Sequence, residues 1–218
     1  MDSSNFKFIK RFESKKLLNE VINLAIYAYF NVILKTKYVK SNMISKRENQ
    51  YRDDLVEAML KCQSECGLNY LIINSEVQEK NNVYGSLDMK IQYRHLKSIN
   101  MVKEKYHTIE CKRFGKNPNL NDYYHHGILD FLNGKYSMNT NFAGLICFVE
   151  QLNEYETIEI LIERINNYLS KKDVSQLEKI INKNYEYVYS FNQPRNNNGE
   201  IINITHLMLD YTEIYSNN

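Results

Sequence analysis

Two stretches of this chain decide its fold: Gly85-Ser86-Leu87-Asp88-Met89-Lys90-Ile91 and Thr108-Ile109-Glu110-Cys111-Lys112-Arg113. Each alternates apolar and polar side chains, a pattern that predicts a β-strand. Successive side chains of a strand point to opposite faces, so Glu110 and Lys112 share one face, with Cβ atoms about 6–7 Å apart. An unpaired charge on a buried strand is costly, so this pair needs compensation. A bound metal ion together with a phosphate would supply it.

The surrounding sequence predicts an α/β fold with a mixed sheet flanked by helices. Apolar residues at helical spacing predict helices over 13–36, 46–66, 123–136, 156–170 and 173–184. Alternating or continuous apolar runs predict strands over 71–77, 83–93, 106–114, 142–149, 185–191 and 201–211. The order helix, three strands, helix, strand is typical of helices packed on the faces of a sheet.

The length of 218 residues suits one domain with a sizeable core and an additional terminal segment. We divide the chain into an N-terminal helical element, residues 1–45, and a main domain, residues 46–218. The amphipathic helix predicted over 13–36 is a candidate surface for a dimer or another partner.

Charge is distributed unevenly along the chain. Residues 1–50 hold ten Lys and Arg against four acids, whereas residues 151–218 hold six against ten. A basic segment beside an acidic one can orient a molecule on a polyanion such as nucleic acid. The alternative is a solvated, lysine-rich surface, and charge alone does not separate the two.

The N-terminus lacks the basic, apolar and small-residue regions of a signal peptide. Polar residues interrupt the apolar stretch 17–34, which is too polar for a membrane span of about 20 residues. We therefore expect a cytoplasmic protein without a membrane partner.

The strand residues resemble a known signature. Asp88 is followed, after 21 residues, by Glu110-Cys111-Lys112, and this spacing resembles the Asp…Glu-x-Lys signature of the PD-(D/E)XK nuclease superfamily. Leu87 stands where the nominal motif has proline. The context agrees with the resemblance, since a helix precedes both strands and a helix and an apolar strand follow them. The resemblance covers about residues 46–150.

The resemblance implies a restriction-endonuclease-like fold and a site for Mg²⁺ or Mn²⁺. Asp88 and Glu110 would be metal ligands, and the main-chain carbonyl of Cys111 a third. Lys112 would position or deprotonate the attacking water. These residue types suit phosphodiester hydrolysis, because carboxylate oxygens bind Mg²⁺ and a nearby ammonium can stabilise charge that develops on phosphorus.

A further carboxylate is expected from the helix that precedes the strands. At 100° per residue, with Glu48 as zero, Leu55 falls at about 340° and Met59 at about 20°. Glu57 falls at about 180°, on the opposite face. Glu48 is therefore predicted to point inward, where it would bind or position a second metal or its water. It also stands three residues after Ser45, as in a capping box, and the two roles are compatible.

Several cations are candidates for substrate contact. Arg52 shares the inward side of the helix and would meet either a phosphate or an acid. Arg94 and Lys97 belong to a basic segment, 94–105, that would grip backbone phosphates or simply be a solvated loop. Arg113 follows the signature directly. Glu76 is either a further acid near the metal or a solvent-facing strand end.

The sequence thus predicts a metal-dependent nuclease that acts on DNA in preference to RNA. Cutting two strands needs two sites, so a homodimer is expected. By analogy with the family, restriction or antiviral (phage) defence is the expected role, as an enzyme or as a subunit of a defence complex. The alternatives are a catalytically idle interaction subunit with a nuclease fold and an endoribonuclease toxin.

Overall fold

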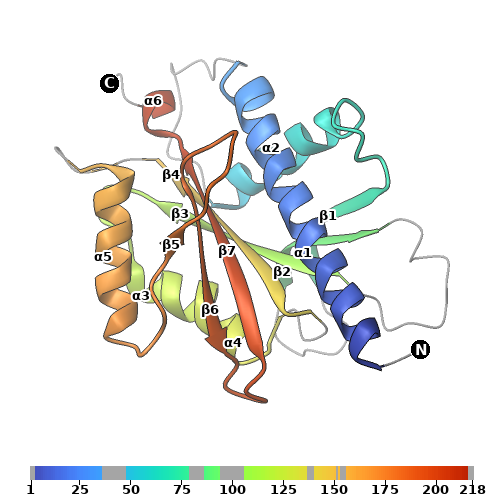
Figure 1. Ribbon diagram of the computed structural model, residues 1–218. Coiled ribbons are helices and arrows are strands. Elements are labelled where there is room, and N and C mark those ends of the chain that lie inside the picture. Colours follow the sequence, from blue (N-terminus) through green and yellow to red (C-terminus); the bar gives the residue numbers. More distant parts are fainter. Residues whose placement is uncertain are drawn as a thin grey trace.

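One mixed sheet organises the molecule (Figure 1). The computed structural model describes residues 3–35, 48–78, 86–93, 106–136, 140–150, 152 and 156–215. Within these ranges seven strands form a sheet in the order β1-β2-β3-β4-β7-β6-β5. The strands are β1 (Leu71–Gln78), β2 (Ser86–Tyr93), β3 (His107–Phe114), β4 (Phe142–Val149), β5 (Glu178–Lys179), β6 (Val188–Pro194) and β7 (Ile201–Asp210). The predicted α/β class and mixed sheet are confirmed.

The pairing of the strands follows from their connections. β1, β2 and β3 pair antiparallel, β4 lies parallel to both β3 and β7, and β6 is antiparallel to β7 and β5. A parallel pair needs a crossover, which α3, η4 and α4 provide between β3 and β4. The helical elements are α1 (Ser3–Ala28), the π-helix η1 (Tyr29–Ile33), α2 (Glu48–Cys62), α3 (Leu120–Asp122), the π-helix η4 (Tyr123–Leu129), α4 (Asp130–Leu132), α5 (Ile158–Ser170) and α6 (Thr212–Tyr215).

The sheet carries a core on each face. Alternate residues of β4 belong to different clusters: Phe148 packs with residues of α1 and α2, whereas Leu145 packs with residues of η4 and α5. All eight residues of β4 are buried. The continuous apolar run therefore correctly predicted a central strand covered on both faces.

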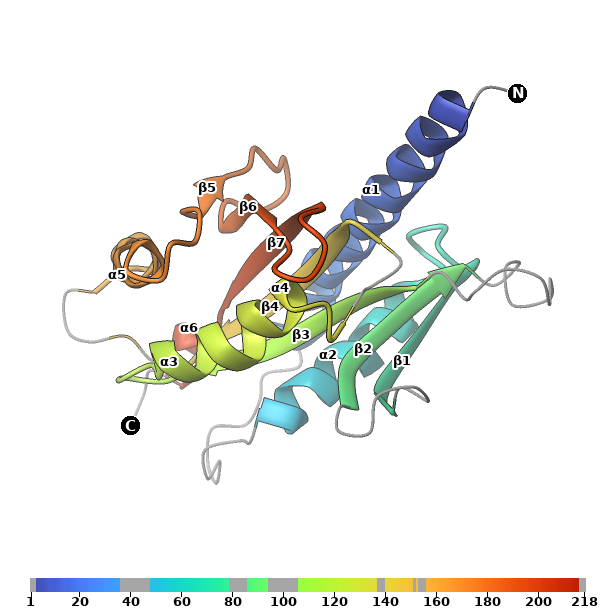
Figure 2. The same ribbon diagram turned by 90° about the horizontal axis from the view of Figure 1, so that it is seen from below.

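The N-terminal helix is part of the core of the chain. Leu17, Val21 and Leu24 are buried in the same cluster as residues of β3 and β4. A Cβ on Gly144 would lie 3.3 Å from Leu18 Cδ1, so helix and strand approach closely. The predicted apolar stripe is thus used within the chain. A partner surface on α1, which stays a prediction, would have to use its other side or its N-terminal end, which projects beyond the sheet (Figure 2).

One predicted helix is wrong. Residues 173–184 form irregular chain with the short strand β5. Asp173 has a φ of 55°, which ends α5, and Asn166 Oδ1 accepts a hydrogen bond from the Leu177 main-chain nitrogen at 2.7 Å. The helical spacing was misleading, because Leu177 is buried while Ile181 is 98% exposed.

Some predictions fall outside the described residues. These are the Ser45 cap and the basic segment 94–105 with Arg94 and Lys97. Among the helices that the structure describes, none is long and apolar enough to cross a membrane.

Candidate active site at a break in the sheet

The pairing of the sheet is interrupted at Asp88. The β1–β2 ladder contains Ser75↔Met89 and Val77↔Leu87, but not the pair between them, Glu76 and Asp88. On the other side, the β2–β3 ladder ends at Met89↔Ile109, one residue before Asp88 would face Glu110. Asp88 therefore lies outside both ladders, and its side chain makes the local connections instead.

Both oxygens of the Asp88 carboxylate accept hydrogen bonds. Oδ2 accepts one from the Cys111 main-chain nitrogen at 2.8 Å, and Oδ1 accepts one from Arg52 Nη1 at 3.0 Å. The Asp88 side chain is 17% exposed. These two contacts fix the direction of the Asp88 carboxylate.

Glu110 is the least compensated carboxylate of the site. It is buried, and its Oε1 has no hydrogen-bond partner among the described residues. Burial, followed by the charge of Asp88 and a hydrogen bond with it, raises the pKa of Glu110 well above its ordinary value. The expected proximity of Asp88 and Glu110 is observed. Two carboxylates in contact in a buried position require a shared proton or a cation.

Lys112 and Glu48 complete the group. Lys112 Nζ lies 3.4 Å from Glu48 Oε1, and the Arg113 main-chain nitrogen donates to Glu48 Oε2 at 2.8 Å. Burial by itself would lower the pKa of Lys112, but the carboxylates of Glu48, Glu110 and Asp88 outweigh it and raise the pKa. Lys112 is therefore a protonated cation at neutral pH. We call Glu48, Asp88, Glu110 and Lys112 the acidic fork.

The rotation predicted for α2 is correct. Glu48 points to the acidic fork, whereas the Glu57 side chain is 67% exposed and pairs with Lys61 at 2.6 Å. This outcome depends only on helical geometry, because positions nine residues apart lie on opposite sides of a helix.

The crossover helix packs closely against β4 and beside Lys112 at Gly127. A Cβ on Gly127 would lie 2.9 Å from Leu145 Cδ1 and 3.8 Å from Lys112 Cε. Gly127 lies in the π-helical element η4, and such wider turns inside helices occur frequently at functional sites. The backbone of η4 therefore approaches the aliphatic stem of Lys112 closely.

The predicted substrate-binding cations have different surroundings. Arg52 is 2% exposed and pairs with Asp53, Glu76 and Asp88, which favours acid pairing, the second role considered for it, over contact with a phosphate. Arg113 Nε pairs with Glu150, so a phosphate would have to replace that partner. The substrate roles stay predictions.

Sequence reasoning missed Asp130. Its charge contributes to the raised pKa of Glu110, and its Oδ2 lies 2.6 Å from Lys135 Nζ. Asp130 follows Glu110 by twenty residues and lies beyond η4, so strand alternation could not indicate it. A long-range contact of this kind needs the folded crossover.

No family model, curated protein or solved structure matches this chain. The site is therefore interpreted from its own residues. Nowhere in the described ranges do three His, Cys, Asp or Glu side chains gather as a metal-holding group. The ligands that the sequence resemblance implies are two carboxylates, Asp88 and Glu110, and the main-chain carbonyl of Cys111. This set fits Mg²⁺, which typically uses one or two carboxylates and keeps several waters. The unpartnered Glu110 oxygen is the observation that supports the fit.

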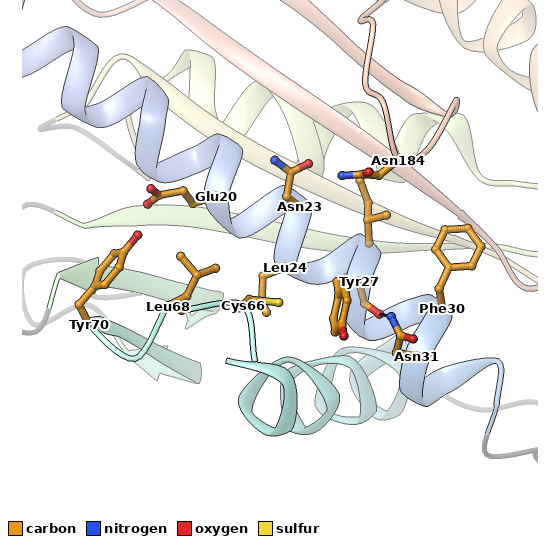
Figure 3. Close-up of a pocket in the computed structure, with 12 residues that line it drawn as sticks. Glu20, Asn23, Leu24, Tyr27, Phe30, Asn31, Cys66, Leu68, Tyr70 and Asn184 are labelled. Atoms are coloured by element: carbon orange, nitrogen blue, oxygen red, sulfur yellow. Dashed lines mark hydrogen bonds between the residues drawn. The ribbon is translucent and has the colours of Figure 1, made fainter. Parts of the chain in front are cut away.

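A separate groove of about 720 Å³ runs along α1 and the turn before β1 (Figure 3). Tyr27, Phe30 and Tyr70 line it, and among the described residues of its lining Glu20 is the one that carries a charge. Since no Lys, Arg or His belongs to that described lining, these residues do not suit a phosphodiester. None of the residues of the acidic fork contributes to it.

Proposed function

We propose that this protein is a Mg²⁺-dependent nuclease of the PD-(D/E)XK kind, with a restriction-endonuclease-like fold. One observation carries the proposal: the buried Glu110, with an unpartnered oxygen, lies beside Asp88 and shares a strand face with the cation Lys112. Most buried polar atoms have a hydrogen-bond partner, and a bound cation beside Asp88 would supply one for this oxygen.

The arrangement of the elements supports the same proposal. α2 precedes three antiparallel strands, a helical crossover follows, and β4 then pairs parallel with β3. This order agrees with the context in which the sequence signature was recognised. Fold analogy raises the expectation of a nuclease, but the function is argued from the acidic fork itself.

Each residue of the acidic fork has a chemical role in this proposal. Bound Mg²⁺ would supply Lewis acidity and lower the pKa of a coordinated water. Asp88, Glu110 and the Cys111 carbonyl would hold the ion. Lys112, being protonated, would orient the attacking water and stabilise charge on the phosphate, rather than act as the base. Glu48 would hold Lys112 in place.

The substrate is proposed to be DNA. Phosphate contacts from Lys and Arg supply affinity for either nucleic acid, independent of sequence, so the preference must be measured. Cytoplasmic location, a homodimer and a role in antiviral defence are part of the same proposal.

The test compares cleavage of duplex DNA, single-stranded DNA and RNA by the purified chain with Mg²⁺, Mn²⁺ or EDTA. We expect DNA cleavage that requires the metal, is lost in Asp88→Asn and Glu110→Gln, and persists in the matched control Glu57→Gln. Cleavage of RNA alone would favour the toxin alternative. Absence of cleavage with every substrate and metal, also with cell extract added, would favour the interaction subunit.

A further inference from the structure

Arg52 connects three elements at the acidic fork. From α2, its Nη1 donates to Asp88 on β2 at 3.0 Å, its Nη2 to Glu76 on β1 at 2.8 Å, and its Nε to Asp53 at 3.0 Å. The guanidinium is almost fully buried, at 2% exposure. Arg52 thus holds the Asp88 side chain at the position where the β1–β2 ladder lacks a pair and the β2–β3 ladder ends.

The local backbone is arranged around this contact. Glu76 has a φ of 49°, in the left-handed region that residues other than glycine rarely adopt, and such strain persists only where the surroundings impose it. Glu76 stands at the missing ladder position opposite Asp88. The Arg52–Glu76 pair therefore bridges the position where backbone pairing between β1 and β2 fails.

The positive charge of Arg52 makes its role testable, because charge repulsion and positioning of Asp88 predict opposite effects on metal binding. Arg52 lies 3.0 Å from a proposed metal ligand, so its positive charge opposes the binding of a cation. If Arg52 acted only through its charge, removing it would strengthen metal binding. If it acts by fixing Asp88, removing it would weaken metal binding in spite of the lost repulsion.

We infer that Arg52 is a positioning residue that fixes the Asp88 carboxylate for a divalent metal, with Glu76 as its second anchor. The inference rests on the proposed metal site but not on nuclease activity. Loss of a partner that orients a metal ligand typically costs about 10- to 100-fold in metal affinity.

The experiment is a Mn²⁺ titration by calorimetry of the full chain and three variants, with the folded state of each checked by circular dichroism. Arg52→Gln is expected to weaken Mn²⁺ binding about 10- to 100-fold. Glu76→Gln changes a side chain that is 59% exposed, so it keeps the fold and is expected to weaken binding by a smaller factor. Glu57→Gln, on the outer side of the same helix, is expected to bind like wild type.

Unchanged or tighter Mn²⁺ binding in both Arg52→Gln and Glu76→Gln would overturn the inference, as would a wild type that binds no Mn²⁺. If Arg52→Gln does not fold, Glu76→Gln decides. A wild type that binds Mn²⁺ through Asp88 and Glu110 but cuts no nucleic acid would refute the nuclease proposal alone, because the role of Arg52 is read from metal affinity.

Discussion

Two regions of the molecule bury polar side chains, one as a neutral pair and the other as a group that contains charged side chains. In the central sheet, His206 is fully buried, and its Nδ1 lies 2.9 Å from the Tyr123 hydroxyl. Burial lowers the pKa of His206 to about 3, so this pair is neutral. At the acidic fork, Lys112 is charged and burial leaves Glu110 poorly compensated.

Under the proposed function, the neutral region serves stability and the charged region serves chemistry. The His206–Tyr123 pair is uncharged and hydrogen-bonded through Nδ1, although His206 Nε2, like Glu110 Oε1, is buried without a hydrogen-bond partner among the described residues. The two regions therefore differ in charge rather than in the number of unsatisfied atoms. The acidic fork collects three carboxylates, those of Glu48, Asp88 and Glu110, against the two cations Lys112 and Arg52. If all three carboxylates were ionised, the buried negative charge would exceed the positive charge of Lys112 and Arg52, which either a proton on Glu110 or a bound cation can offset. Perturbed groups of this kind cluster at functional sites.

The largest effect is expected for Lys112→Ala. If Lys112 handles the water or the developing charge, the cleavage rate should fall by on the order of 100-fold or more. Nucleic-acid affinity should change much less, because the other basic residues predicted to contact phosphates are unchanged. Single-turnover cleavage beside a binding titration at fixed salt measures both. Equal cleavage rates in wild type and variant would show that Lys112 takes no part in the cleavage step.

The next effect separates the two acids of α2. Glu48→Ala removes the partner of Lys112 and of the Arg113 main-chain nitrogen, and we expect cleavage to fall by about 10- to 100-fold. Glu57→Ala should leave the rate close to that of wild type. The same assay decides, and a wild-type rate in Glu48→Ala would show that Glu48 is not needed for cleavage.

The neutral His206–Tyr123 pair predicts that the unfolding free energy falls in acid. The folded pKa of His206 lies below its ordinary value of 6.5, so its contribution to stability is complete above that value and is lost as the pH falls toward 3. The loss is at most about 1.4 kcal/mol per pH unit. His206→Asn should therefore show a flatter decline of the unfolding free energy between pH 6.5 and 4, measured by urea denaturation. Parallel curves would show that His206 does not titrate on unfolding.

The acidic fork predicts the opposite dependence. Because the folded pKa of Glu110 is raised, the metal-free protein loses stability as the pH rises from about 4.3, the unfolded value, through the folded pKa. The decline continues until the pH reaches the folded pKa and then levels off. Glu110→Gln should remove this decline and, with it, the stabilisation by added Mg²⁺. Thermal unfolding across pH, with and without Mg²⁺, measures both, and equal Mg²⁺ stabilisation of the variant would place the ion elsewhere.

The sequence by itself determined the features that depend on local geometry. Strand alternation placed Glu110 and Lys112 on one face, and the 100° step of a helix turned Glu48 inward and Glu57 outward. The continuous apolar run of 142–149 gave the central strand. Each of these follows from the repeat of a single element, so no knowledge of its neighbours was needed.

Only the tertiary structure decided which groups meet across elements. Arg52 pairs with Glu76 and Asp88 at the position where both strand pairings of β2 are interrupted. The register between two strands cannot be predicted from the alternation of either strand alone. Asp130 comes near Glu110 only through the crossover. Residues 173–184 failed as a helix because side-chain contacts such as Asn166 with Leu177 satisfied their backbone. Long-range pairing overrides local propensity wherever a burial or hydrogen-bond requirement can be met only by a distant residue.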